Sequence, residues 1–305
     1  MMVIDGCFIL ELLYRFQYGI GEGDPIFDNI LVTHDIKNDL LLLENQIPFF
    51  ILEILFRLTV KRILNHASLT DLIFYFFKDM NIINSELTIT DDTMEHCHIL
   101  GIFQSCYRPR ATKRGRIPTI SYSATEIAGA GVRFKAQRDE SSLLAVKFKQ
   151  LSFVPGLVNL FVRETLLSIK ISTPSLLRNL IAYEQCYPLS RHYVTSFAFL
   201  MDRLIDTKDD VSLLVRSTVL QHNLGASEDV TNLFNNICNG VVLLDFYYTE
   251  EWRQLDEYCN QFWPSILISL RRLYKSTTWK TLTVIAAMII FAVTLVQTIY
   301  TVHNG

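Results

Sequence analysis

The chain has 305 residues, of which 50% are hydrophobic and 19% charged, and its mean hydropathy is +0.24. This composition excludes disordered and collagen-like chains, which are polar or rich in glycine and proline. The formal net charge of −3 leaves no basic excess to attract a phosphate backbone, so we expect no nucleic-acid partner.

Residues 1–106 are predicted to form an N-terminal helical part. Apolar side chains recur there at helical spacing, and Pro48 is expected to kink or break the second helix. The expected helices cover residues 3–14, 39–58, 69–77 and 94–104.

The next segment, residues 107–122, is predicted to be a basic linker, and it contains Pro109 and Pro118. We interpret it as a solvated loop, and contact with anionic lipid headgroups is the alternative. Its cationic residues are Arg108, Arg110, Lys113, Arg114 and Arg116.

Residues 123–280 are predicted to combine a small sheet with further helices. The sequence SATE at residues 123–126 fits a capping box that opens a short helix. Apolar and polar residues alternate over 132–135 and 144–149 around a polar turn, which predicts a β-hairpin, with 166–171 as a candidate third strand. The helices expected after the sheet cover residues 175–187, 195–205, 210–219, 228–238 and 250–274.

The segment from Thr281 to Val302 carries no charged residue and is predicted to be a transmembrane anchor. As a helix it would extend over roughly 33 Å, enough to cross a bilayer; a buried core helix is the disfavoured alternative. The positive-inside rule places residues 1–280 in the cytoplasm, at the plasma membrane or an endomembrane. The basic residues that precede the anchor are Arg271, Arg272, Lys275 and Lys280.

The predicted fold class is therefore mainly α with a small antiparallel β element (α+β), plus one C-terminal transmembrane helix. The six cysteines form no CxxC pair, which argues against a disulfide scaffold and for a reducing compartment. His96 and His98 point in different directions on a helix, so we expect no metal site and no cofactor.

The sequence contains no GxSxG, SxxK or HExxH motif, and we assign no catalytic residue. His192 and His222 are the histidines to test first for a catalytic triad that forms only on folding, with Ser190 or Ser196 near His192.

Two short polar clusters interrupt otherwise apolar helical segments. The first is Glu44, Asn45 and Gln46, and the second is Tyr183, Glu184 and Gln185. Because buried polar groups need hydrogen-bond partners, we predict that the clusters bond to each other or to a backbone segment across the core. A polar ligand pocket is the alternative.

Several motifs carry a resemblance to a known family. They are MVIDGCFILEL at residues 2–12, DLLLLENQIPFF at 39–50, SATE at 123–126, AGVRF at 130–134 and RNLIAYEQ at 178–185. With them, the chain resembles the plant membrane-protein family called domain of unknown function 247.

The resemblance implies a mainly helical, C-terminally anchored plant protein, and some grass members resemble self-incompatibility determinants. It supplies no catalytic residues. Members usually carry an additional N-terminal region ahead of the segment that begins here at Met2, which implies a truncated paralogue or an incomplete gene model.

The function that we expect is recognition or signalling through an unknown protein partner, by a domain anchored at a membrane. Two alternatives stay open at this point. One is a membrane-bound, hydrolase-like enzyme with a non-local catalytic site, and the other is a truncated, non-functional paralogue.

Overall fold

The computed structural model describes most of the chain between residues 2 and 294. The described residues are 2–19, 23–80, 98–107, 115–116, 118–119, 121–135, 146–149, 163–167, 169–171, 174–187, 191–222, 225–261, 264–266, 268–269, 283 and 286–294. The predicted residues His96 and Ser190 lie outside them.

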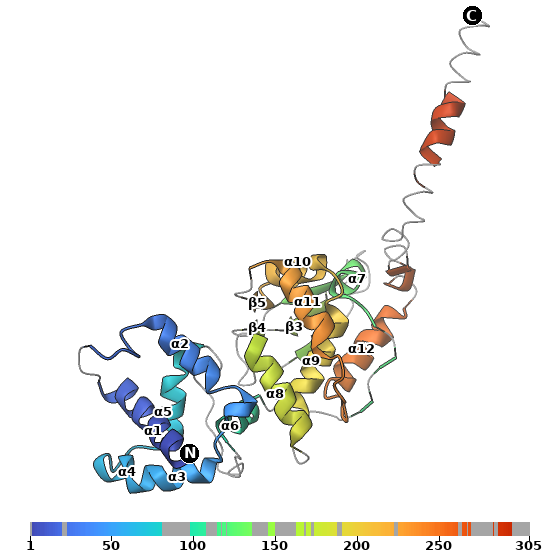
Figure 1. Ribbon diagram of the computed structural model, residues 1–305. Coiled ribbons are helices and arrows are strands. Elements are labelled where there is room, and N and C mark those ends of the chain that lie inside the picture. Colours follow the sequence, from blue (N-terminus) through green and yellow to red (C-terminus); the bar gives the residue numbers. More distant parts are fainter. Residues whose placement is uncertain are drawn as a thin grey trace, which may run out of the picture.

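Helices near the N-terminus form one lobe of the molecule, at the lower left of Figure 1. Pro48 ends the irregular stretch after Asp39 and precedes a new helix, so the predicted break at this proline is confirmed. The elements are α1 (Met2–Tyr18), α2 (Ile30–Asp39), η1 (Leu43–Asn45), α3 (Phe49–Leu58), α4 (Val60–Ile63), α5 (Leu69–Phe76), η2 (Lys78–Met80) and α6 (Ile99–Cys106).

The second lobe contains the later helices and the strands (Figure 1). Its first helix opens with the predicted capping box, because the Ser123 hydroxyl accepts from the Glu126 amide and the Glu126 carboxylate accepts from the Ser123 amide. The helices are α7 (Ala124–Gly129), α8 (Pro174–Cys186), α9 (Tyr193–Leu204), α10 (Lys208–Arg216), α11 (Ser227–Ile237) and α12 (Thr249–Cys259).

The strands form a mixed three-stranded sheet and a separate parallel pair. In the larger sheet β3 lies in the middle, parallel to β1 and antiparallel to β2, and the pair joins β4 to β5. The strands are β1 (Val132–Lys135), β2 (Val146–Lys149), β3 (Arg163–Leu167), β4 (Ile169–Ile171) and β5 (Leu220–His222).

The predicted hairpin is wrong in its pairing, although both of its strands exist. β1 and β2 each pair with β3, so a mixed sheet replaces the antiparallel element. Alternating polarity identifies a strand with one buried face, but it does not specify the neighbour. β5 was not predicted, because a strand of three residues is too short to show a period.

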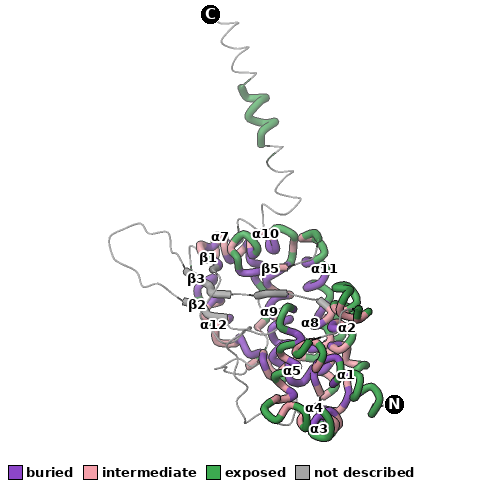
Figure 2. Tube along the Cα trace, turned by 90° about the vertical axis from the view of Figure 1, so that its left-hand side faces the viewer, coloured by how far each residue is buried: buried purple, intermediate pink, exposed green. Residues whose placement is uncertain are grey.

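A continuous hydrophobic core extends through both lobes, and α6 lies within it. Six of the eight residues of α6 are buried, including Leu100 and Phe103. Figure 2 shows buried segments distributed through the packed body of the molecule. α6 therefore needs partners for its polar groups inside the protein.

The predicted anchor is described in part. Of its residues, 283 and 286–294 are described, and they are helical and exposed. Within the portion of the chain that the structure covers, no helix has the length and apolar character needed to cross a bilayer. The span from Thr281 to Val302 thus stays a prediction.

Candidate functional site

Two residues of the first predicted cluster lie at the surface. Glu44 and Asn45 are exposed on η1, which corrects the expectation that they are buried in a helix. Asn45 donates to the Asp39 carbonyl at 3.0 Å. Pro48 and the short 3-10 turn keep this segment out of the α-helical geometry in which Glu44 and Asn45 were expected to face the core.

Gln46, the third residue, connects its own segment to α6. Its side-chain oxygen accepts from the Leu100 amide at 3.0 Å, in the first turn of α6. Its nitrogen donates to the carbonyls of Leu40 and Leu42, both at 2.8 Å. The amide of Gln46 therefore satisfies one backbone donor of α6 and holds the irregular stretch before α3.

Glu184 is a buried carboxylate that accepts bonds from two other helices. One oxygen accepts from Gln104 Nε2 and from the Val194 amide, both at 2.9 Å. The other accepts from the Thr195 amide at 2.7 Å and from its hydroxyl at 2.6 Å. Burial raises the pKa of Glu184, and these hydrogen bonds act in the opposite direction.

Glu184 serves as the N-terminal cap of α9. The residue before that helix, His192, makes no side-chain capping bond, and Val194 and Thr195 are in its first turn. A carboxylate at a helix N-terminus satisfies free amides and interacts favourably with the helix dipole. Glu184 thus joins α8, α9 and, through Gln104, α6.

The neighbours of Glu184 complete the second cluster. Gln185 exchanges two hydrogen bonds with the backbone of Val242, each at 2.9 Å. Tyr183 stacks on Tyr187 with 5.7 Å between ring centroids, and meets the His98 ring edge-on at 4.9 Å. His98 caps α6, and burial lowers its pKa to about 4.

The two clusters meet at α6. Gln46 bonds near its start and Glu184 near its end, by way of Gln104. A further link between the two segments runs from the Leu43 amide to Asn179 of α8 at 2.9 Å. This arrangement supports the structural interpretation for Gln46 and Glu184, which hold α6 in the core, whereas Glu44 and Asn45 take no part in it.

Asp210 is a second buried acid, which was predicted to start a helix but was not predicted to be buried. One oxygen accepts from the Thr125 amide of α7 at 2.7 Å, and the other from Thr207, which precedes α10. Burial by itself raises the pKa of Asp210, but the bonds from Thr125 and Thr207 bring it below the usual value. The spacing of Thr207 and Asp210 resembles a capping box, which was the available signal.

The catalytic candidates do not form a triad where they are described. The Ser196 hydroxyl is buried and accepts from the Tyr247 amide at 2.8 Å, while the His192 ring lies 3.5 Å from Gln185. Burial raises the pKa of Cys106 to about 11 and that of Cys238 to about 12, so both thiols are protonated at neutral pH. Among the described residues, no cluster of His, Cys, Asp and Glu is arranged to hold a metal ion.

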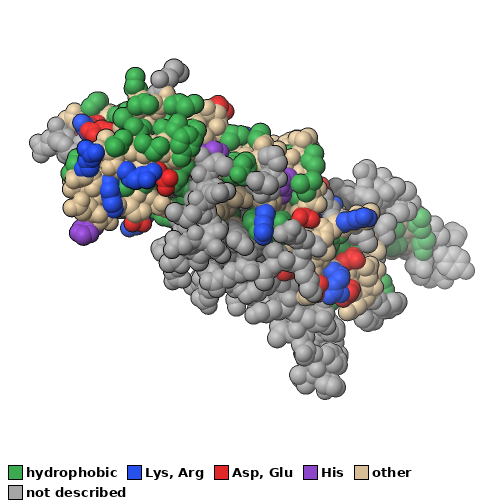
Figure 3. All heavy atoms as spheres, turned by 90° about the horizontal axis from the view of Figure 1, so that it is seen from below, with side chains coloured by type: hydrophobic (Ala, Val, Ile, Leu, Met, Phe, Trp, Pro, Cys, Tyr) green, Lys and Arg blue, Asp and Glu red, His purple; other side chains and the backbone are tan. Residues whose placement is uncertain are grey.

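An exposed apolar surface covers one side of the first lobe. On α3 a buried stripe of Phe49, Leu52 and Phe56 faces the core, and a second stripe faces solvent. Figure 3, seen from below, shows hydrophobic side chains gathered there. This apolar face consists of Met2, Val3, Ile4 and Phe8 of α1, Phe50, Ile54 and Leu58 of α3, and Ile63 of α4.

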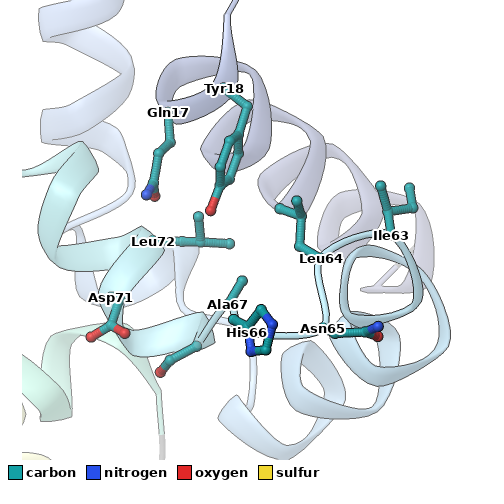
Figure 4. Close-up of a pocket in the computed structure, with 10 residues that line it drawn as sticks. Gln17, Tyr18, Ile63, Leu64, Asn65, His66, Ala67, Asp71 and Leu72 are labelled. Atoms are coloured by element: carbon teal, nitrogen blue, oxygen red, sulfur yellow. The ribbon is translucent and has the colours of Figure 1, made fainter.

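A hollow of about 440 Å³ lies beside this face. It is bounded by the end of α1, the loop from α4 to α5 and the first turn of α5. Figure 4 shows Gln17 and Tyr18 reaching into it from α1, opposite His66 and next to Leu64 and Leu72. None of the six predicted cluster residues lines this hollow.

Comparisons with known proteins place the chain in a family. Residues 1–293 match the family described as plant protein of unknown function, domain of unknown function 247. A UPF0481 protein of Arabidopsis thaliana is 26% identical over 335 residues, which cover 97% of this chain and 66% of that relative. A putative UPF0481 protein of the same plant is 25% identical over 62% of this chain and 34% of its own length.

The chain thus spans less than two thirds of the length of either curated relative. No solved structure matches it. Since the family match extends over nearly the whole sequence, the chain belongs to the domain of unknown function 247 family of plant proteins.

Proposed function

We propose that the protein is a recognition or signalling module that is held at a membrane and acts through contacts with another protein. The apolar face carries this proposal, because soluble monomers rarely expose large contiguous apolar surfaces. The uncharged segment from Thr281 to Val302 supports membrane attachment, since a bilayer core of about 30 Å needs a helix of this length.

Charges of both signs around the apolar face favour a protein partner over lipid. The surface of an anionic bilayer offers one sign of charge, whereas a protein surface can offer both.

Charged groups of opposite sign border the apolar face. Asp5 is exposed on α1, whereas Arg57 and Arg62 are exposed on α3 and α4. A complementary partner carries acidic groups beside α3 and α4 and a basic group beside α1. The partner that fits is an amphipathic helix with an apolar stripe between the two kinds of charge.

The double substitution Ile54→Ser with Leu58→Ser tests this proposal. It removes apolar area from the face at two exposed positions, so we expect at least a tenfold loss of the native complex in solubilised plant membranes. The matched control is Val242→Ser with Leu244→Ser, two exposed apolar residues outside the face, which should leave the complex unchanged.

An intact complex in the first variant, or an equal loss in the control, would contradict the proposal. The mass of the complex and the identity of its chains complete the test. A complex that contains two copies of this chain and nothing else overturns the assignment to a different protein.

A further inference from the structure

Building on the proposed function, we propose that the hollow beside α1 receives a tryptophan side chain of the partner protein. A hollow of about 440 Å³ falls within the usual size of small-ligand sites, roughly 300–1,000 Å³. Interfaces often depend on one aromatic anchor inserted in such a hollow, and tryptophan is among the commonest anchors.

Gln17 provides a hydrogen-bond acceptor at the hollow. Its side-chain oxygen is buried and has no hydrogen-bond partner among the described residues, while the side chain lines the hollow. The terminal amide torsion of glutamine is broad, so the oxygen can turn toward a donor that enters. A ligand with an N–H group therefore gives this oxygen the bond that it lacks.

The walls select an aromatic group without negative charge. Leu64, Ala67 and Leu72 supply apolar surface, and the rings of Tyr18 and His66 lie on opposite sides of the hollow in Figure 4. Among the described residues that line the hollow, Asp71 is the acidic one, and its carboxylate disfavours an anionic ligand.

Tryptophan fits these walls better than the other aromatic residues. The indole N–H of tryptophan donates a hydrogen bond and accepts none. The tyrosine hydroxyl also donates, but its oxygen is an additional acceptor that needs a donor from the hollow. Phenylalanine has no donor for Gln17.

The hollow is continuous with the apolar face through Ile63. This residue lines the hollow and is also 69% exposed on the face. A tryptophan seated in the hollow thus belongs to a segment that covers the neighbouring apolar stripe. The hollow and the face are then two parts of one interface, with the tryptophan as its anchor.

The test uses the purified full chain in nanodiscs and N-acetyl-5-fluorotryptophanamide, followed by fluorine NMR. We expect saturable binding that Gln17→Leu weakens at least tenfold. The N1-methyl analogue of the probe, which lacks the indole N–H, should bind the wild type at least tenfold more weakly than the probe itself. Gln17→Leu should abolish this preference for the unmethylated indole. Gln261→Leu, at an exposed glutamine after α12, is the matched control and should change nothing.

A third variant, Ala67→Phe, fills the hollow and should abolish binding. If that variant does not fold, the comparison of the two probes on the wild type still decides the test. Absence of saturable binding, or equal binding of the two probes to the wild type, overturns the inference.

The two proposals fail in different ways. If the probe does not bind but Ile54→Ser with Leu58→Ser still releases the complex, the hollow is not the anchor site and the proposed function stands. If the probe binds with N–H selectivity but the complex survives that double substitution, the site takes a free aromatic ligand and the assignment to a partner's side chain is wrong.

Discussion

Glu184 and Asp210 are buried acids that each cap a helix from another part of the chain. Glu184 of α8 accepts from the first turn of α9, and Asp210 of α10 accepts from the first turn of α7. Helix amides at these ends have no partner within their own helix, so a buried helix start needs an acceptor from elsewhere. The two carboxylates thus hold pairs of helices in place within the core.

Removal of the Glu184 carboxylate should destabilise the protein. Glu184→Ala leaves the buried amides of Val194 and Thr195 without their acceptor, and we expect a loss of about 3 kcal/mol in the free energy of unfolding. Urea unfolding of the full chain in mild detergent measures this loss. Glu44→Ala, at an exposed acid of the other predicted cluster, is the control and should change stability by less than about 0.5 kcal/mol. Equal effects of the two substitutions would show that Glu184 does not act as the cap.

His98 should make stability depend on pH between about 4 and 6.5. Burial lowers its folded-state pKa to about 4 from the usual 6.5, so in this window the unfolded chain binds a proton that the folded chain does not. The contribution of His98 to stability therefore decreases as the pH falls through the window.

Asparagine at this position can keep an acceptor for the Gly101 amide but does not titrate. We expect His98→Asn to lose less unfolding free energy than the wild type between pH 7 and pH 5, measured by urea unfolding. The same loss in both proteins would mean that His98 titrates normally in the folded chain.

At the scale of elements, local signals in the sequence predicted helix starts better than strand partners. The capping box at Ser123 and the break at Pro48 depend on neighbouring residues, and both were predicted. The pairing of β1 with β3 joins segments about thirty residues apart, and no local pattern specifies such a partner.

The segment predicted as a linker makes a defined contact at Gly115. Its backbone forms an antiparallel bridge with Phe246, with N–O distances of 3.2 and 2.9 Å. A Cβ atom at Gly115 would lie 2.6 Å from Thr249 Oγ1 and 2.7 Å from Thr249 Cγ2. Because threonine is branched at Cβ, it has few alternative rotamers with which to move away.

Gly115→Ala should therefore lower the free energy of unfolding by about 1–3 kcal/mol. Gly225→Ala is the matched control, since a Cβ atom there meets nothing within 4 Å. Thermal unfolding of the two variants compares them directly. A Gly115→Ala protein as stable as Gly225→Ala would indicate that the bridge is loose.

For the whole molecule, the sequence pointed to two of the polar residues that hold α6 but not to the surface that we propose as functional. Gln46 and Glu184 stood out as polar groups in apolar segments, and both meet α6. The apolar face was not predicted, because Phe50 and Phe49 have the same chemistry and only the packing of α1 against α3 decides which is exposed. The hollow depends on three separate segments and has no sequence signature.

Membrane attachment is a prediction for the whole chain. A protein truncated after Lys280 lacks the uncharged segment and should move to the supernatant on carbonate extraction of plant membranes, whereas the full chain should stay in the pellet. Retention of the truncated protein would show that another part of the molecule binds the membrane. Protease digestion of an N-terminal tag on sealed microsomes tests the cytoplasmic orientation that the positive-inside rule predicts.

Contact between the apolar face and a partner protein is the central claim, and photo-crosslinking in plant cells tests it most directly. A benzophenone amino acid replaces Phe50 on the face, or Leu244 at an exposed apolar position elsewhere, in the full-length chain. We expect one discrete adduct with a different protein from position 50, lost on Ile54→Ser with Leu58→Ser, and no such adduct from position 244. Adducts with lipid alone at position 50, or the same adduct from both positions, would contradict it.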